Sequence, residues 1–503
     1  MNGPGSRAVS IGLQGVLQRV CVPTGSASIL MRVSRQQVCL AFFPSTKFER
    51  SSTVTVAATT MHILILIVFA IGYLAIAFEH KLHVNKAASA LLIGALCWGL
   101  YVVNWHTLVL PEDIPRWFWL EAQMQGVDNV PLHYAVESQH LSQTGEIASI
   151  LFFLMGAMTI VELVDSHESF ALITDRIQTT DKRTLLWVVG ILTFFMSAVL
   201  DNLTTTIVMV SLLRKLISDR EDRLRFIGLT VIAANSGGAW TVIGDVTTTM
   251  MWIQHKLGAV DVMGKLFVGS LVCLLVPLFS FSYMMPGKLA TTGERAAIPS
   301  DIRPWHQWLF LILGLVGLLG VPVFKTVTHL PPYMGMMLSL SVLWVTSELV
   351  GHTLSEETRS TTGVLPALKR VDMSSILFFL GILLAVGSLA ATGILQSTAA
   401  WLDDVLPNRD VVAIVIGLVS SVVDNVPLVA AGMKMYDLPM NDPFWMLLAY
   451  CAGTGGSCLI IGSAAGVAAM GIEQINFMWY LKKIAIWAVF GYLAGAVVVI
   501  LMI

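Results

Sequence analysis

The 503-residue chain is too apolar for a soluble protein. Hydrophobic residues make up 56% of it, charged residues 12%, and its mean hydropathy is +0.77. This composition excludes a soluble globular fold of that length and predicts an all-α polytopic membrane protein, with the lipid bilayer as its partner. The formal net charge of -2 and the lack of a basic run give no indication of nucleic-acid binding.

The first 60 residues differ from the rest of the chain. They contain a single acidic residue, Glu49, and no uninterrupted apolar core of the kind a signal peptide has, whereas an apolar helix begins directly at Met61. Two interpretations stay open. Either Met61 is the true first residue, or residues 1–60 are a plastid or mitochondrial transit peptide.

Apolar stretches able to enter a bilayer succeed one another from residue 62 to the end of the chain. In chain order they cover about 62–78, 87–110, 147–163, 185–213, 226–253, 266–285, 308–324, 334–349, 374–389, 411–433, 444–470 and 484–503. The acidic segment Pro111–Gly145 between the second and third stretches is predicted to be a long external loop.

Three landmarks occur twice, in the same order. SILFFL is found at 149–154 and again at 375–380, and the pair Asp201-Asn202 returns as Asp424-Asn425. NSGGAWTVIGD, which starts at Asn235, aligns with GTGGSCLIIGS, which starts at Gly453. Because the offset between copies drifts only from 226 to 223 to 218 residues, the sequence predicts two repeats, residues 61–290 and 300–503.

The positions of Lys and Arg predict that these repeats are inverted. Three basic residues lie between 176 and 183, before the first Asp-Asn pair, and five lie between 214 and 225, after it. Both flanks are therefore expected to be cytoplasmic, as in a re-entrant hairpin, whereas a full crossing would place one strongly basic flank outside. Beside the second pair stand only Arg409 and Lys434, so that hairpin is expected to enter from the opposite face. Each repeat then has about five transmembrane helices plus one hairpin.

Each repeat also places a carboxylate and a glycine-broken helix in apolar sequence. Charge at membrane depth is costly and irregular backbone there lines a cavity, so these features indicate a secondary transporter rather than an enzyme, without a cofactor. Asp and Asn offer hard oxygen donors that suit a small alkali cation, and two carboxylates would repel an anion. We therefore expect Na⁺ or Li⁺ at Asp201 and Asp424, in competition with protons.

The paired Asp-Asn segments, NSGGAWTVIGD and the GTGGS segment at 453–457 resemble the NhaD-type sodium/proton antiporters of the ion transporter superfamily, over residues 61–503. The resemblance implies efflux of Na⁺ and Li⁺ in exchange for protons across a bacterial inner membrane, or a plastid envelope if residues 1–60 are a transit peptide. It also implies a homodimer in which a transport block moves against a scaffold. The residues that match the family's intramembrane polar positions are Glu146, Asp201, Asn202, Asn235, Asp245, Thr247, Thr248, Ser420, Asn425 and Ser457, and Asp424 fits by repeat symmetry.

Alternatives stay open for the function and for single residues. Relatives in the same superfamily carry dicarboxylates or arsenite, so an anion transporter is the first alternative. An intramembrane aspartyl protease is a remote one, because Ile243-Gly244-Asp245 departs from the Gly-x-Gly-Asp arrangement of that class. Asp245 could simply cap the helix after it. Glu146 could be a solvated first-turn acid, with Glu162 the more buried carboxylate of that helix.

Overall fold

The computed structural model describes residues 52–77, 79–174, 177, 179–289, 302–406 and 408–503. The chain divides into two units, Met1–Thr53 and Val54–Ile503, and the second contains the candidate membrane helices. The interpretations of residues 1–60 fall mostly outside the described residues, of which helix α2 (Ser52–Ala77) is the first element. Apart from one isolated bridge between Asp181 and Lys288, the regular structure of the described residues is helical, which confirms the all-α prediction.

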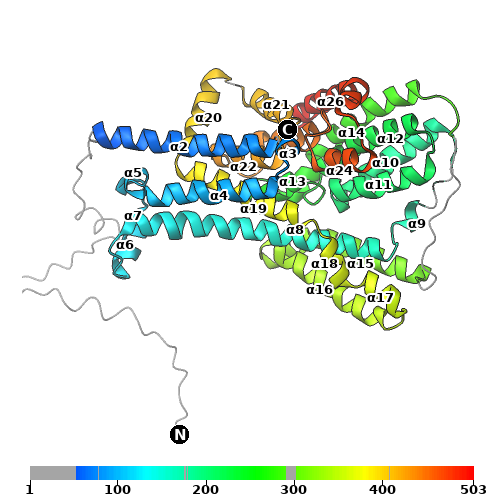
Figure 1. The fold of residues 1–503 in the computed structure, drawn as a ribbon, viewed down its shortest axis with the longest axis horizontal. Helices are drawn as coiled ribbons and strands as arrows, with labels where there is room; N and C mark the ends of the chain where they lie inside the picture. The colour runs from blue at the N-terminus through cyan, green and yellow to red at the C-terminus, as the bar shows by residue number, and fades with distance from the viewer. Residues whose placement is uncertain (1–51, 78, 175–176, 178, 290–301, 407) are drawn as a thin grey trace, which may run out of the picture. The chain divides into compact units, whose positions relative to one another are not determined.

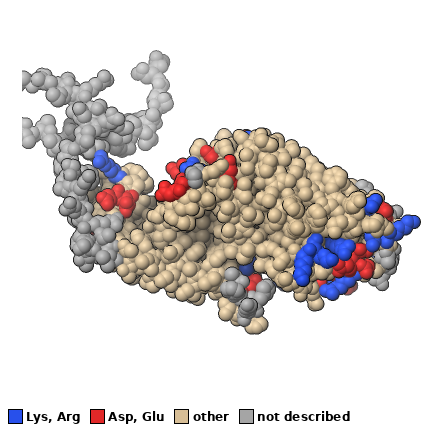
Figure 2. All heavy atoms as spheres, turned by 90° about the horizontal axis from the view of Figure 1, so that it is seen from above, with Lys and Arg blue, Asp and Glu red and all other residues tan. Residues whose placement is uncertain are grey.

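Nine helical stretches of the described residues are long and apolar enough to cross a membrane, which confirms the polytopic membrane protein. They contain α2, α4 (Lys86–Val103), α8 (Ser142–Ser166), α10 (Lys182–Leu200), α14 (Ala259–Met284), α15 (Pro304–Thr328), α16 (Pro332–Gly351), α19 (Met373–Ala391) and α26 (Ile486–Met502). Figure 2 shows Lys, Arg, Asp and Glu side chains in a few clusters, the largest toward one end of the face in view, and uncharged side chains over most of the surface between them. Such an apolar surface is what a bilayer requires.

The remaining helices are outside these stretches or only part of one, and apart from α12, which has 20 residues, they are short. They are α3 (Glu79–Leu82), α5 (Trp105–Leu108), η1 (Pro111–Asp113), α6 (Arg116–Met124), α7 (Val130–His133), η2 (Tyr134–Leu141), α9 (Ala171–Thr174), α11 (Asn202–Leu216), α12 (Arg220–Ala239), α13 (Val246–Ile253), α17 (Glu356–Thr362), α18 (Val364–Arg370), α20 (Ile394–Val405), α21 (Arg409–Val419), α22 (Asn425–Met435), α23 (Pro443–Gly455), α24 (Ala464–Glu473), α25 (Phe477–Tyr480) and η3 (Leu481–Ala485).

The segment expected to be a long loop, Pro111–Gly145, is mostly helical. From Val130 the chain continues through α7, the π-helical η2 and α8 as one stretch of 37 residues. Asn129 starts this stretch, because its side chain accepts the Leu132 N–H at 3.2 Å. Pro131 stands in the first turn, where backbone N–H groups have no partner within the helix, so its missing N–H costs no hydrogen bond. The polar residues on both sides of this start signal made the segment resemble a loop.

The helices of the second unit pack in two groups. In the first group, α4 packs along α19, and α8 packs against α15, α16 and α19. In the second, α10 packs along α12, α14 along α26 and α21 along α23. Contacts of α13 with α8 and of α22 with α19 join the groups. Figure 1 shows α2 and α4, in blue, on one side, and α10, α11, α12 and α14, in green, on the other.

Two glycines allow helices of the second group to cross in backbone contact. A Cβ atom on Gly237 of α12 would overlap the carbonyl oxygen of Phe194 in α10. One on Gly455 of α23 would likewise overlap the carbonyl oxygen of Gly417 in α21. Only a residue without a side chain permits this approach. The crossings hold the ends of α12 and α23 directly against α10 and α21.

A buried carboxylate ties the ends of three helices together. Glu473 is the last residue of α24, and its Oε1 lies 3.0 Å from Nε of Arg214 in the last turn of α11. Its Oε2 lies 3.1 Å from Nε of Arg223 in α12. Arg223 also donates to the carbonyl oxygens of Ile217 and Ser218, in the α11–α12 loop. Because both oxygens of Glu473 have a charged partner, burial of its charge is compensated.

We predict that Gly237→Ala lowers the free energy of unfolding by about 1–3 kcal/mol, because the added methyl group forces α10 and α12 apart. The measurement is thermal unfolding of the purified protein in detergent. Gly264→Ala is the matched control, since a Cβ atom there meets nothing within 4 Å and alanine is the better helix former. Equal unfolding temperatures for the two variants would contradict the backbone crossing.

Candidate functional site

Two helices of the second group stop and resume after a short non-helical segment. After α12 ends at Ala239, α13 begins with Asp245 as its N-cap, and after α23 ends at Gly455, α24 begins with Ser463 as its N-cap. Asp245 Oδ1 accepts the backbone N–H of Thr247 at 2.8 Å and its hydroxyl at 2.5 Å. The capping role left open for Asp245 is therefore confirmed.

Six buried polar side chains form one hydrogen-bond network between these breaks, and Thr247 belongs to it through the bond from its hydroxyl to Asp245. The Asn202 amide donates to Asp245 Oδ2 at 2.6 Å and to Asn235 Oδ1 at 3.1 Å. The Asn235 amide donates to the hydroxyl oxygens of Ser457, at 2.8 Å, and Ser463, at 2.9 Å. The network thus joins segments from both halves of the chain. It brings together five of the predicted site residues, Asn202, Asn235, Asp245, Thr247 and Ser457.

Asp201 lies next to this network, at the junction of α10 and α11. Its Oδ1 accepts the Thr204 N–H at 2.8 Å and its Oδ2 the Thr204 hydroxyl at 2.9 Å, so it caps α11. Its φ of +80° is unfavourable for a residue with a side chain, and strain of this kind persists only where the surroundings enforce it.

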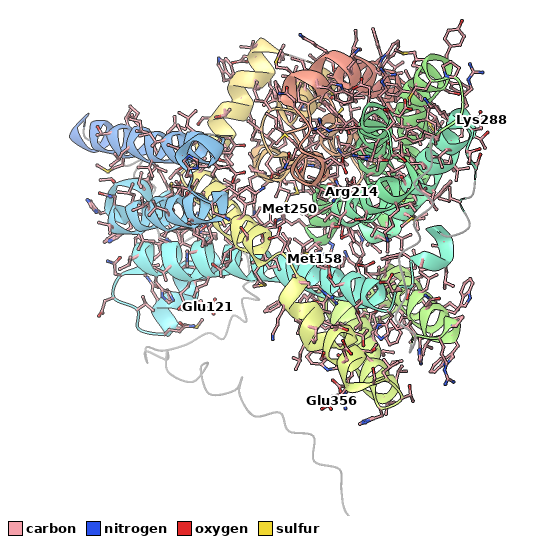
Figure 3. All side chains as sticks on the ribbon, turned by 45° about the vertical axis from the view of Figure 1, so that its right-hand side comes forward. Glu121, Met158, Arg214, Met250, Lys288 and Glu356 are labelled. Carbon is pink, nitrogen blue, oxygen red and sulfur yellow. The ribbon has the colours of Figure 1, made fainter. Side chains whose placement is uncertain are left out.

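A cavity of about 60 Å³ opens beside Asp201 and Asn202, and its other lining residues are mostly apolar and include Met158 of α8. In Figure 3, Met158 lies in the middle of the unit, as does Met250 of α13. The Asp201 carboxylate therefore borders an enclosed, apolar part of the protein, where its charge is poorly solvated.

The two carboxylates of this region have neutral partners. Among the described residues, no Lys, Arg or His forms an ion pair with Asp201 or Asp245, and Asp245 is only 1% exposed. A carboxylate buried without a basic partner is costly unless a proton or a metal cation neutralises it. The amide and hydroxyl oxygens around Asp245 are hard donors of the type that alkali cations prefer. The arrangement can therefore hold a small cation or a proton.

Asp424 forms no hydrogen bond with this network among the described residues. Its Oδ1 accepts the Val426 N–H at 3.2 Å, which caps α22, and its Oδ2 lies 3.6 Å from Nζ of Lys86. It lines a separate cavity of about 140 Å³, together with Tyr73, Glu79, Lys86 and Ser463. Asp201 and Asp424 thus border different cavities.

Three other predicted residues donate hydrogen bonds to backbone carbonyl oxygens. Thr248 donates to the Thr241 carbonyl oxygen at 2.8 Å, Ser420 to Gly417 at 2.7 Å and Asn425 to Ala452 at 3.4 Å. These three side chains are buried near the breaks, but among the described residues none of them has a hydrogen bond to the network.

Glu146 lies elsewhere, in the first turns of α8. It is 45% exposed and pairs with Lys434 at 3.1 Å, while Glu162 pairs with Arg370 at 3.3 Å and is 30% exposed. Both acids therefore have basic partners, whereas Asp201 and Asp245 have none in the part of the chain that the structure describes.

Two residues of the site were missing from the predicted set. Ser463 had a signal in the sequence, because it aligns with Asp245 when the two glycine segments are superposed. Lys86 stands at the start of an apolar stretch, where a basic residue ordinarily faces the lipid headgroups, so nothing in the sequence marked its carboxylate partner.

We predict that Asn235→Ala lowers the free energy of unfolding by about 1–3 kcal/mol, because it leaves buried partners of the network unpaired. Asn104→Ala is the control, since within the described part of the chain the Asn104 amide donates to the nearby Leu100 carbonyl oxygen, at 2.8 Å, and to no distant segment. Thermal unfolding in detergent compares the two. A loss no larger for Asn235→Ala than for the control would mean that the network adds nothing to stability.

Several known transporters are similar to this chain over most of its length. A family model described as "Citrate transporter" matches residues 73–437. "Sodium/proton antiporter 1" of Arabidopsis thaliana is 45% identical over 441 residues, which are 87% of this chain and 72% of that protein. "Sodium/proton antiporter 2" of the same plant is 42% identical over 434 residues, 85% of this chain and 97% of that protein. "Na(+)/H(+) antiporter NhaD" of Alkalimonas amylolytica is 29% identical over 494 residues, 92% of this chain and 95% of that protein. The chain therefore belongs to the NhaD-type sodium/proton antiporters, a family of secondary transporters and not of enzymes.

Proposed function

We propose that the chain exchanges Na⁺ or Li⁺ for protons across a membrane, and that the cation binds at Asp201, Asp245 and the polar groups around them. The observation that carries this proposal is the buried Asp245 carboxylate, whose hydrogen-bond partners are the neutral Asn202 and Thr247. A proton and an alkali cation each neutralise such a carboxylate, but one excludes the other. Competition for one negative site couples the two ions, which is the chemistry of antiport.

We assign different parts in this reaction to the other residues. Asn202, Asn235, Thr247 and Ser457 supply neutral oxygens near Asp245, and Thr248 and Ser420 hold the backbone beside the breaks. Asp424 and Asn425 form the corresponding pair of the second half and bind the cation on its way through the second cavity. Glu146, with its Lys434 partner, lies at the margin of the protein and is assigned to cation entry or release.

We further propose that the halves are inverted repeats, each with a re-entrant hairpin. In support, α21 and α22 have 11 residues each and so extend about 16 Å, about half of a bilayer core of roughly 30 Å. The glycine crossings at Gly237 and Gly455 and the caps at Asp245 and Ser463 also keep the 218-residue offset of the sequence landmarks. If α12–α13 and α23–α24 are counted as broken crossings and α10–α11 as a hairpin, five crossings fall in each half.

Assembly and membrane are proposed from the resemblance. We assign a homodimer, located in a bacterial inner membrane, or in a plastid envelope if residues 1–60 are a transit peptide. The matched antiporters come from a plant and from a bacterium, which agrees with either membrane.

Anion transport is the second candidate function. The family model that matches residues 73–437 is described as a citrate transporter, and a cavity of about 470 Å³ is lined by five basic side chains against one acid, Glu146. Those basic residues are His255, Lys256, Lys325, His329 and Lys434. At Asp201 and Asp245, however, an anion would meet two carboxylates without a basic partner among the described residues. Cation exchange therefore fits the network better.

We predict that Asp201→Asn and Asp245→Asn each lower sodium-driven proton flux about tenfold or more. The amide keeps the helix cap but loses the charge, and each 1.4 kcal/mol of lost cation binding is a factor of about ten. Proton movement is followed with a pH-sensitive dye in everted membrane vesicles, after addition of NaCl, LiCl or KCl. The vesicles come from a bacterial host without its own sodium/proton antiporters.

Asp442→Asn is the matched control, because Asp442 also caps a helix, α23, and lies outside the network. It is expected to keep the wild-type flux. Unchanged flux in both site variants would refute the assigned site. Citrate uptake without sodium-driven proton flux in the wild-type protein would favour the anion transporter instead.

A further inference from the structure

We propose that the ammonium group of Lys86 is a built-in competitor of the transported cation at Asp424. This inference rests on the proposed cation exchange and adds a residue that sets the apparent affinity for sodium. Lys86 acts through Asp424 and is therefore a positioning residue.

The pair links the two groups of helices. Lys86 is the first residue of α4 in the first group, and Asp424 caps α22 in the second. The ammonium nitrogen lies 3.6 Å from Asp424 Oδ2, with 25% and 20% of the two side chains exposed. It also lies 4.6 Å from the ring centre of the buried Phe378 in α19, whose face attracts a cation. The ammonium group is thus held at the carboxylate from two sides.

An alkali ion at Asp424 Oδ2 would meet this ammonium group. Oδ1 of Asp424 already accepts the Val426 N–H, and Oδ2 faces Lys86. Sodium and ammonium are both monovalent cations attracted to the same oxygen and they repel each other, so in this proposal sodium binds more tightly once the ammonium group has moved away. Asp424 therefore differs from Asp201 and Asp245, which have no basic partner among the described residues.

The surrounding cavity offers the displaced group a second carboxylate. Glu79 lines the same cavity of about 140 Å³, and its Oε2 accepts the backbone N–H of Lys86 at 3.2 Å. The hydroxyl of Tyr73, which has no hydrogen-bond partner among the described residues, also lines it. The four-carbon stem of lysine is flexible, so the ammonium group can turn from Asp424 toward Glu79 while its backbone stays in place. When the sodium ion leaves, the ammonium group returns to Asp424.

The test compares Lys86→Gln with Lys86→Arg by sodium-driven proton flux at one alkaline pH. Without the tethered cation, the KM for Na⁺ is expected to fall about two- to fivefold, as loss of a partly exposed ion pair allows, while kcat does not rise. Arginine keeps the charge and should restore the wild-type KM. An unchanged or higher KM in Lys86→Gln overturns the inference.

Glu79→Gln is an independent variant that is expected to change the KM for Na⁺ in the opposite direction. If Glu79 receives the displaced ammonium group, its loss favours the Lys86–Asp424 pair, and the KM for Na⁺ should rise about twofold or more. A fall in KM would overturn the exchange between the two carboxylates.

Lys182→Gln is the matched control, since Lys182 forms an ion pair with Asp222 at 2.5 Å with similar exposure, 19% and 15%. Its KM should equal that of the wild type. If the wild-type protein itself shows no sodium-driven flux, the proposed function fails. If it does and Lys86→Gln leaves the KM unchanged, only the role of Lys86 fails.

Discussion

The rest of the structure depends on a carboxylate that is buried without a basic partner among the described residues. Asp245 lies where the charge of a carboxylate is strongly disfavoured, and the side chains that contact it are neutral donors. No amount of hydrophobic packing removes that cost. In the proposed function a bound cation or proton neutralises this charge, and that neutralisation links the fold to ion exchange.

The interruptions between α12 and α13 and between α23 and α24 bring backbone polar groups close to this carboxylate. A continuous α-helix uses its backbone groups internally and presents only side chains, whereas an interrupted one exposes carbonyl oxygens and N–H groups at membrane depth. Such an interruption is tolerated here because other chain segments cover it. Gly237 and Gly455 let α10 and α21 lie directly against the breaks, so the exposed backbone faces protein rather than lipid. The glycine-rich motifs thus both shape the site and seal it.

Local sequence signals predicted much of this site. Asn202, Asn235, Asp245 and Ser457 stand in motifs that occur twice, and polar residues repeated in apolar sequence have few roles other than to meet at one site. Contacts between distant segments were beyond such signals. The partnership of Lys86 with Asp424 depends on how α4 packs relative to α22, which no local motif encodes. The helical course of Pro111–Gly145 was missed for a different reason, since the cap at Asn129 stands among polar residues typical of loops.

The ion pairs of Glu473 with Arg214 and Arg223 link α24, α11 and α12. Asn202 belongs to α11, Asn235 belongs to α12, and Ser463 is the N-cap of α24. In the proposed transport cycle, a rearrangement that keeps these ion pairs would move the three helices together. The sliding surface would lie instead where α13 and α22 touch α8 and α19, the contacts between the two groups of helices.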